Sequence, residues 1–190
     1  MTAVTPLGLG LGLVFLVALV PAMATATEIV QTDVTQDHGQ YRIVFEVLLD
    51  ANADKVRQYM TDYAHLDRLS DTVIADQVLG KQKNGLERIK LVLHSCIFIF
   101  CKTMTEVEDV AVRPDGDIVT TVVPEQSDFS LATEHWQILP EQNQTRIKYD
   151  AVRVPRFFIP PIIGPLIVKA KIRKELATSA MRLEQLAHSP

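Results

Sequence analysis

The chain has 190 residues, about the length of one domain, and 47% of them are hydrophobic. Charged residues make up 22% of the chain, and the formal net charge is −4 at pH 7. Such a chain has no general basic field that would hold nucleic acid or an anionic membrane, so a membrane contact would need a local basic cluster. We expect one domain that is a monomer and binds no nucleic acid.

The first 24 residues carry no charged side chain and contain an apolar run from Leu7 to Val20. This run has the length of a signal-peptide core and is short for a membrane span. Ala22 and Ala24 then place small residues where a signal peptidase cuts. The pattern predicts a signal peptide over residues 1–24, cleavage near Ala24, and export to the periplasm or the exterior. An uncleaved N-terminal anchor is the alternative.

The segments that follow predict strands, two short helices, more strands and a long helix. Residues 25–39 are polar and fit either a linker or an edge strand. Alternation from Tyr41 to Leu49 predicts a strand, and Asp50 or Asn52 can cap a short helix over 53–60. A second short helix is expected over 63–70. Six further alternating segments predict antiparallel strands: 72–80, 86–94, 102–112, 117–123, 129–139 and 145–154.

A proline-rich stretch leads into an amphipathic segment, which predicts a long helix from near Pro165 to about Ala187. A meander of this length must curl, and its concave face needs cover, which only this helix is long enough to provide. The fold class is therefore expected to be α+β. A curved antiparallel sheet of about six to seven strands would wrap round the C-terminal helix.

Three stretches of the chain resemble one known superfamily. They are FEVLLDANADKVRQYMTDYAHL near the start, ATEHWQILPEQNQTRIKYDAV near the end, and the terminal amphipathic helix. Together they resemble the START-like helix-grip superfamily (SRPBCC) over a domain spanning residues 40–188. The chain looks most like its polyketide cyclase/dehydrase and coenzyme Q-binding branch. The resemblance implies a cavity for an apolar molecule such as a lipid, quinone or polyketide, with no metal and no cofactor. An exported member departs from the intracellular roles of that branch.

Cys96 and Cys101 are the only cysteines and bracket the sequence IFIF. In an oxidising compartment two cysteines tend to pair. Residues five apart on one extended strand are about 16 Å apart, whereas a disulfide needs Cα atoms within about 7 Å. A disulfide therefore requires a hairpin tip at IFIF, and the strand direction must reverse near this point. The alternative is a buried strand with two free thiols.

The sequence contains no recognisable catalytic motif. The five histidines lack metal-ligand spacing, and the region after the signal segment has no nucleophile or phosphate-binding motif. No catalytic residue and no metal ligand is assigned. Glu106 and Glu108 share one strand face, and their charge predicts a solvent-exposed outer face.

Glu134 is a stronger candidate because it shares a strand face with Trp136, which is expected to point inward. It would orient a polar group of a ligand, unless it lies solvated at the rim. An enzyme of the cyclase or dehydratase kind would need Glu134, Tyr63 or Tyr149 as its acid or base. We therefore expect a binder of a hydrophobic molecule and keep that enzyme as the alternative. The expected ligand-binding side chains are Phe45, Tyr63, Ile89, Leu91, Glu134, Trp136, Ile172 and Leu176.

Two apolar segments, CIFIF and FFIPPIIGPLIV, predict either core that closes one end of the fold or an entrance that touches a membrane. Basic residues follow the second segment at once, and such residues meet anionic headgroups. Docking to a protein partner is a third option for these segments. The expected membrane or entrance residues are Phe98, Phe100, Phe157, Phe158, Lys169 and Lys171.

Overall fold

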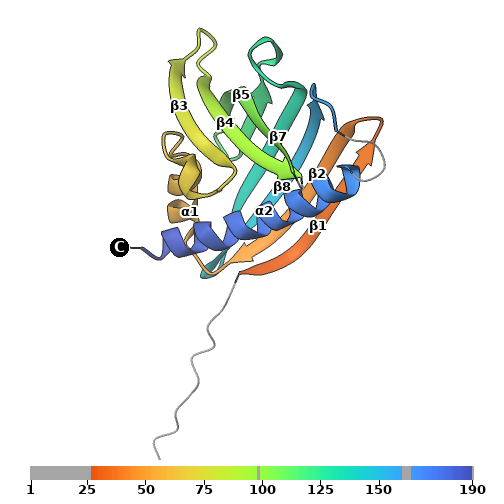
Figure 1. Ribbon diagram of the computed structural model, residues 1–190. Coiled ribbons are helices and arrows are strands. Elements are labelled where there is room, and N and C mark those ends of the chain that lie inside the picture. Colours follow the sequence, from red (N-terminus) through yellow and green to blue (C-terminus); the bar gives the residue numbers. More distant parts are fainter. Residues whose placement is uncertain (1–26, 98, 160–163, 190) are drawn as a thin grey trace, which may run out of the picture.

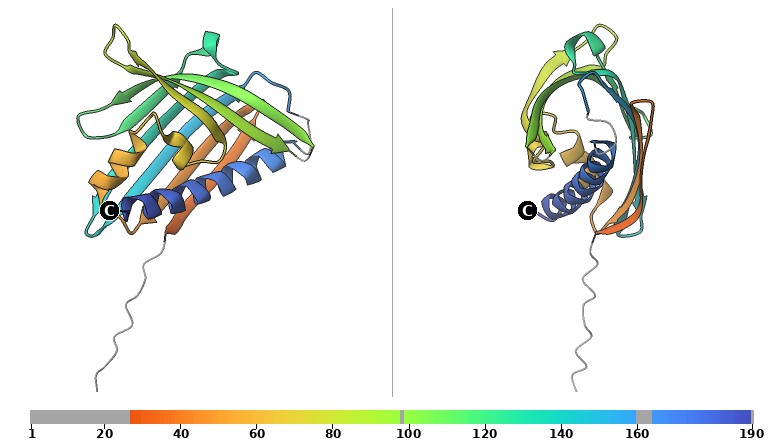
Figure 2. Two further views of the ribbon diagram at one scale, coloured as in Figure 1. Left: turned by 60° about the vertical axis from the view of Figure 1, so that its left-hand side comes forward. Right: turned by 45° about the vertical axis from the view of Figure 1, so that its right-hand side comes forward.

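The computed structural model describes residues 27–97, 99–159 and 164–189. The predicted signal peptide over 1–24 lies outside these ranges. One curved antiparallel sheet curls round a long helix, as Figures 1 and 2 show. The strands are β1 Glu28–Asp37, β2 Gln40–Leu49, β3 Val73–Lys81, β4 Glu87–Ile97, β5 Phe100–Val112, β6 Ile118–Val122, β7 Phe129–Glu141 and β8 Gln144–Pro155. The helices are α1 Ala53–Met60 and α2 Gly164–Ala187, with 3-10 turns η1 Leu66–Arg68 and η2 Pro124–Gln126.

The eight strands lie in the order β1-β2-β8-β7-β6-β5-β4-β3, and neighbouring strands are antiparallel. Helix α2 lies across the concave side and contacts β1 and β2 near one edge and β4 near the other (Figure 2). A strongly curved sheet exposes its inner face unless another element covers it. The helix supplies that cover, which gives the α+β helix-grip architecture.

Two details of the predicted fold change. The sheet has eight strands rather than six to seven, because residues 28–37 form the edge strand β1. The second predicted helix, over 63–70, is reduced to the three-residue turn η1. Helix α1 begins where the sequence indicated: the Asn52 side chain accepts a hydrogen bond from the Asp54 backbone N–H at 2.9 Å. Its inward residue Val56 is fully buried.

Alternation in β2 and β8 sets which side chains face α2. In β2 the odd-numbered residues from Tyr41 to Leu49 are buried, and the even-numbered ones are more exposed. Phe45 lies opposite Tyr149 of β8, and Tyr149 lies opposite Trp136 of β7. Directly opposite residues share one face of a sheet, so all three point toward the helix.

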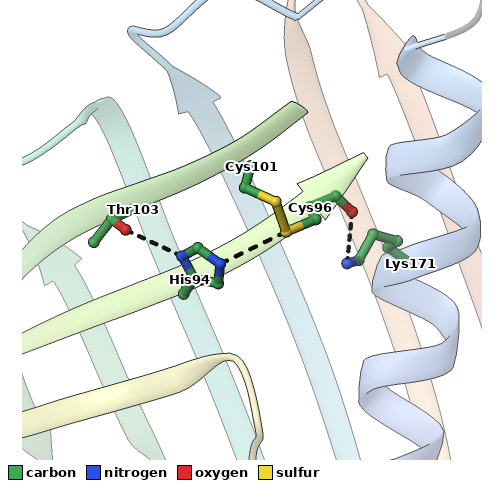
Figure 3. The surroundings of a disulfide bond; sticks show 5 residues. All are labelled: His94, Cys96, Cys101, Thr103 and Lys171. Carbon is green, nitrogen blue, oxygen red and sulfur yellow. Dashed lines mark hydrogen bonds between the residues drawn. A yellow bond between two sulfur atoms is a disulfide. The ribbon is translucent and has the colours of Figure 1, made fainter. Parts of the chain in front are cut away.

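The tip of the β4–β5 hairpin carries the disulfide that the sequence predicted. Cys96 lies opposite Cys101, their Cα atoms are 3.9 Å apart, and their sulfurs are bonded. Beyond the bond, Ile99 at the turn is 87% exposed. Figure 3 shows that the Lys171 ammonium of α2 donates a hydrogen bond to the Cys96 carbonyl at 2.9 Å. The hairpin tip is therefore joined to the helix as well as stapled to itself.

We expect the double variant Cys96→Ser/Cys101→Ser to fold but to lose about 2 kcal/mol of unfolding free energy, because the bond closes only a short loop. Urea unfolding of both proteins measures the difference. Treatment with a reductant should lower the stability of the wild type and leave the double variant unchanged. Intact-mass analysis after alkylation gives an independent readout, and two alkylated thiols in unreduced exported protein would contradict the disulfide.

Candidate functional site

The structure gathers the apolar residues proposed to bind a ligand. Phe45, Tyr63, Ile89 and Leu91 are buried in one hydrophobic cluster between the sheet and α2. Partly buried side chains from β7 and α2 pack against this cluster, among them Trp136, Ile172 and Leu176. Trp136 stacks on Tyr149 with their ring centroids 3.8 Å apart. These side chains, drawn from distant parts of the chain, line the concave interior.

The interior also contains a second, smaller apolar cluster nearer the disulfide end of β5. It consists of Met104, Val122, Phe129 and Ala132, with Leu93 and Phe157 packed against it. Leu93 contacts both clusters. Strand β5 contributes Met104 to the second cluster and Val110 to the first. Glu106 and Glu108 lie between these two residues on the same face of the strand. The two apolar regions are therefore separated by charged side chains.

These glutamates contradict the prediction of a solvated outer face. Glu106 is 0% exposed and Glu108 is 3% exposed, and they share the concave face with Leu91 and Ile89 of β4. The prediction rested on charge alone, and the neighbouring residue Val107 does not take the inward face. Val107 is instead buried on the convex side, where η2 and the following loop cover it: the Val123 backbone N–H donates to its carbonyl at 2.7 Å.

Glu134 is buried too, so the alternative that it lies solvated at the rim is wrong. It is 8% exposed and shares the concave face with Trp136. One carboxylate oxygen accepts from the Tyr149 hydroxyl at 3.0 Å, and the other accepts from the Trp136 indole N–H at 3.1 Å. The Arg153 guanidinium donates to Glu134 as well, and to Glu106 at 2.9 Å.

Arg153 joins three strands. It starts on β8, lies opposite Ala132 of β7, and ends against Glu106 of β5. The fully buried Ala132 has a side chain small enough for the arginine to pass over it. The short strand β6 ends at Val122, opposite Glu108, so β6 has no residue opposite Glu106. A single guanidinium can thus reach both carboxylates.

The electrostatics of this network are those of a buried ion pair. Burial by itself would raise the pKa of Glu134, but the charge of Arg153 and the hydrogen bonds from Arg153, Trp136 and Tyr149 outweigh it and lower that pKa. Burial would likewise lower the pKa of Arg153, yet the charges of Glu106 and Glu134 raise it. Burial raises the pKa of the Tyr149 hydroxyl, and the charge of Glu134 adds to the rise. Glu134 and Arg153 are both ionised at neutral pH.

Glu108 differs because the structure gives it no ion pair. Burial raises the pKa of its carboxyl well above the ordinary value, and the charges of Glu106 and Glu134 raise it further. The more distant Arg153 lowers it by less. A buried carboxyl in this state carries its proton, so it can donate a hydrogen bond as well as accept one.

Several buried polar atoms on this surface have no hydrogen-bond partner in the protein. They include Glu106 Oε1, Glu108 Oε1 and Thr120 Oγ1. Thr120 lies opposite Glu134 and diagonal to Glu108, so the three side chains share the concave face. The Tyr63 hydroxyl is also buried without a partner, and burial together with the charge of Glu87 raises its pKa to about 12. Such atoms are costly to bury unless something else satisfies them.

The predicted entrance residues divide into two groups. Phe158 is 81% exposed, whereas Phe157 is partly buried and packs edge-on against Phe129 with ring centroids 5.8 Å apart. Lys171 is exposed and contacts the hairpin tip, and Lys169 is partly buried. The predicted residue Phe98 lies outside the described residues, and the side chain of Phe100 does too.

Among the described residues, the single group with metal-ligand distances is His94, Cys96 and Cys101, whose ligand atoms lie within 4.8 Å of one another. Both sulfurs are committed to the disulfide, and His94 Nε2 lies 3.6 Å from the Cys96 sulfur (Figure 3). A disulfide offers no thiolate, and zinc requires thiolate from cysteine. This group therefore suits a stapled loop rather than a metal centre.

Sequence reasoning missed Glu106, Glu108, Thr120 and Arg153. The sequence of β5 did contain a signal for the two glutamates. Met104, Glu106, Glu108 and Val110 lie on one face of the strand, and the apolar residues at both ends of this series indicate that the face points inward. Arg153 gave no such signal, because only the pairing of β8 with β7 and the end of β6 bring it to Glu106.

Comparison with solved structures identifies the fold. A START superfamily protein from Mycobacterium smegmatis has a TM-score of 0.62 at 17% identity, over 76% of this chain and 98% of that chain. The Zhui aromatase/cyclase from Streptomyces sp. R1128 has a TM-score of 0.63 at 13% identity, over 78% and 93%. A STAR-related lipid transfer protein from Xanthomonas axonopodis has a TM-score of 0.57 at 18% identity, over 81% and 99%.

At these identities the likeness shows that the chain has the START-like helix-grip fold. No family model matches the sequence, and no curated protein matches it. Within the described ranges, no helix has both the length and the apolar character needed to cross a bilayer.

We expect the raised pKa of Glu108 to make stability fall as pH rises. Above the ordinary carboxyl pKa of about 4.3, the unfolded chain has lost a proton that the folded protein keeps. The unfolding free energy should therefore decrease with pH by up to about 1.4 kcal/mol per pH unit until the raised pKa is passed. Glu108→Gln removes this proton, so the stability of the variant relative to the wild type should rise over that window.

Urea unfolding between pH 5 and pH 8 measures this dependence. Glu125→Gln, which changes an exposed carboxyl in η2, is the matched control. Its unfolding free energy should change with pH in the same way as that of the wild type. A constant difference between Glu108→Gln and the wild type across the whole range would contradict a protonated Glu108.

Proposed function

We propose that the protein is an exported binder or carrier of a hydrophobic small molecule, held between the concave sheet and α2. The observation that carries this proposal is the incomplete burial of apolar side chains at the centre of the fold. Leu93, Trp136, Ile172 and Leu176 all face the interior, yet each stays partly accessible to solvent. A sealed core of this size would bury them. The START-like fold of the similar structures supports the same function.

The physical benefit of such an interior is the removal of hydrocarbon from water. Each methylene that a lipid, quinone or polyketide-like ligand buries contributes about 0.8 kcal/mol. Binding of this kind needs no bond to be made or broken and no cofactor. Our proposal places the ligand against Phe45, Ile89, Leu91, Trp136, Ile172 and Leu176. Glu134 and Tyr63 would contribute polar groups. We propose that the protein belongs to the polyketide cyclase/dehydrase and coenzyme Q-binding branch of the superfamily.

Export is supported by two independent features. The segment 1–24 has the pattern of a signal peptide, and the domain contains a disulfide, a bond typical of proteins outside the cytosol. We propose that the domain acts in the periplasm or outside the cell, after cleavage near Ala24. A carrier in such a space would move its ligand between surfaces across water.

One end of the molecule is suited to contact with a membrane. Large apolar side chains are exposed there: Ile99 at 87%, Phe158 at 81% and Leu166 at 67%. The hairpin tip, the end of β8 and the start of α2 come together at this end (Figure 2). Lys169 and Lys171 follow on α2, and each basic residue near an anionic surface contributes about 1 kcal/mol. We propose that this end docks to a lipid surface and admits the ligand.

A second candidate function is catalysis of the cyclase or dehydratase kind. The specific observation in its favour is the buried Glu108 carboxyl beside the apolar interior, because burial raises its pKa and a neutral acid can protonate or polarise a carbonyl oxygen. Tyr63 and Tyr149 offer further hydroxyl groups nearby on the same cluster. Conversion of a bound polyketide-like substrate by the wild type, and its loss in Glu108→Gln, would favour the enzyme over the carrier.

We expect the exported protein to retain a hydrophobic molecule in native mass spectrometry, with a mass that disappears after organic extraction. Leu93→Trp should abolish this retention, because Leu93 joins the two interior apolar clusters and a larger ring there would fill the space. Val92→Trp is the matched control, since Val92 points to the opposite face of β4 and should leave binding unchanged. Equal retention by Leu93→Trp and the wild type would contradict an interior site.

We expect the protein to float with vesicles that contain anionic lipid and to stay behind with neutral ones. The double variant Ile99→Glu/Phe158→Glu should lose at least ten-fold in vesicle binding, because charged groups are costly to insert among lipid chains. Val112→Glu tests specificity, as Val112 is 53% exposed at the far end of β5. If Val112→Glu reduces binding as much as the double variant, the proposed docking end is wrong.

A further inference from the structure

The charges on the concave face do not balance. Glu106, Glu108 and Glu134 lie there together, and the structure pairs them with one cation, Arg153. Even when Glu108 holds a proton, two carboxylates share one guanidinium. A surplus negative charge in a low-dielectric interior is costly unless a counter-charge compensates it.

The rest of the chain does not supply that counter-charge. The segments outside the described residues contain no Lys or Arg. Lys102, the basic residue of β5 nearest to the cluster in sequence, lies 3.9 Å from Asp128 and over the Phe157 ring. On α2, Lys171 donates to the Cys96 carbonyl, and the inward residues Val168, Ile172 and Leu176 are apolar. In the described part of the chain, Arg153 is therefore the one cation that contacts these carboxylates.

When Glu106 and Glu108 are both ionised, the same surface offers three hydrogen-bond acceptors without a protein partner. Glu106 Oε1, Glu108 Oε1 and Thr120 Oγ1 are buried, and their residues are between 0% and 6% exposed. Cross-strand pairing places Glu106 and Glu108 on one strand and Thr120 diagonal to Glu108, all facing inward. Thr120 is neutral, so its orphaned hydroxyl indicates a missing hydrogen-bond partner independently of the surplus charge.

A metal ion would be one source of positive charge, but the geometry does not favour it. The carboxylate oxygens of these three glutamates do not form a group within 4.8 Å of one another, although the described residues do contain one such group elsewhere. A hard divalent cation needs several oxygen ligands in close convergence. An organic cation with directed N–H donors tolerates wider spacing.

We propose that the ligand is a cationic amphiphile, with a protonated primary amine at Glu106, Glu108 and Thr120 and an apolar body beside Trp136 and Leu93. An ammonium group carries one positive charge and three N–H donors, which matches the surplus charge and the three unpartnered acceptors. This inference rests on the proposed binding function and names the class of molecule that is bound.

The alternatives fit less well. A fatty acid or phosphate would add negative charge beside carboxylates that already exceed their counter-ion. An alcohol could satisfy one or two of the acceptors but would leave the charge uncompensated. A neutral quinone carries only acceptors, so it would leave Glu106 Oε1 without a donor and the surplus charge uncompensated.

The test compares three probes with the same chain length: decylamine, 1-decanol and decanoate, each below its aggregation limit at pH 7. Trp136 is the only tryptophan and packs against the interior cluster, so its fluorescence reports binding. We expect decylamine to bind at least ten-fold more tightly than decanol and decanoate. Decanol binding as tightly as decylamine, or decanoate binding most tightly, would overturn the amine while leaving the proposed binder intact. Failure of all three probes would overturn both.

Variants separate the site from the general negative charge of the protein. Glu106→Gln should weaken decylamine binding at least ten-fold and change decanol binding less than three-fold. Glu46→Gln removes the same charge from the convex face, where Glu46 pairs with Arg146, and should change neither by more than two-fold. Equal losses in these two variants would overturn the proposed site. Thr120→Val gives a second test with no change in charge, and it should weaken decylamine binding several-fold.

Discussion

The interior of this protein is organised around one partly buried arginine that pairs with two buried glutamates. Arg153 crosses from β8 over Ala132 to Glu106 on β5, and it also contacts Glu134 on β7. Each charged group loses its hydration on burial, and a partner on another strand compensates for that loss. Removing one partner would leave an uncompensated buried charge, so the network couples the three strands. The contact also determines where polar chemistry exists in a fold that is otherwise lined with hydrocarbon.

The position of this network explains why the interior is not one continuous apolar core. It divides the concave face into a larger cluster under α2 and a smaller one near the disulfide. Apolar side chains cannot pack closely against charged groups that must keep their hydrogen bonds. Residues at the boundary, such as Leu93 and Trp136, consequently stay partly accessible. The proposed amphiphile would find a polar end point and an apolar wall in this arrangement.

The hairpin tip and the helix form a second unit at one end of the molecule. The disulfide holds the β4–β5 turn, and Lys171 joins that turn to α2. A constrained turn can display Ile99 to its surroundings without the entropy cost of ordering a free loop. The covalent bond therefore supports the most exposed large apolar side chain of the described residues, as the proposed docking surface would require.

Local patterns proved reliable wherever one residue type decides the outcome. Asn52 caps α1, alternation defines β2, and a covalent bond between Cys96 and Cys101 is compatible only with a turn between them. Weak patterns were less reliable, because contacts with the rest of the fold override them. The helix predicted over 63–70 is only the turn η1, and the sequence left open whether residues 28–37 form a strand.

The sequence by itself determined the fold class, the closing helix and the inward set that includes Phe45, Ile89 and Trp136, since each follows from periodicity or from chain geometry. It limited the two cysteines to a stapled tip or a strand with free thiols, and the structure shows the stapled tip. Only the tertiary structure decided that Glu106, Glu108 and Glu134 face inward together. Charge in a sequence predicts exposure unless a counter-charge is in reach, and here that counter-charge comes from Arg153, which is 47 residues from Glu106 along the chain. The pairing of β7 with β8 and the early end of β6 bring the two together.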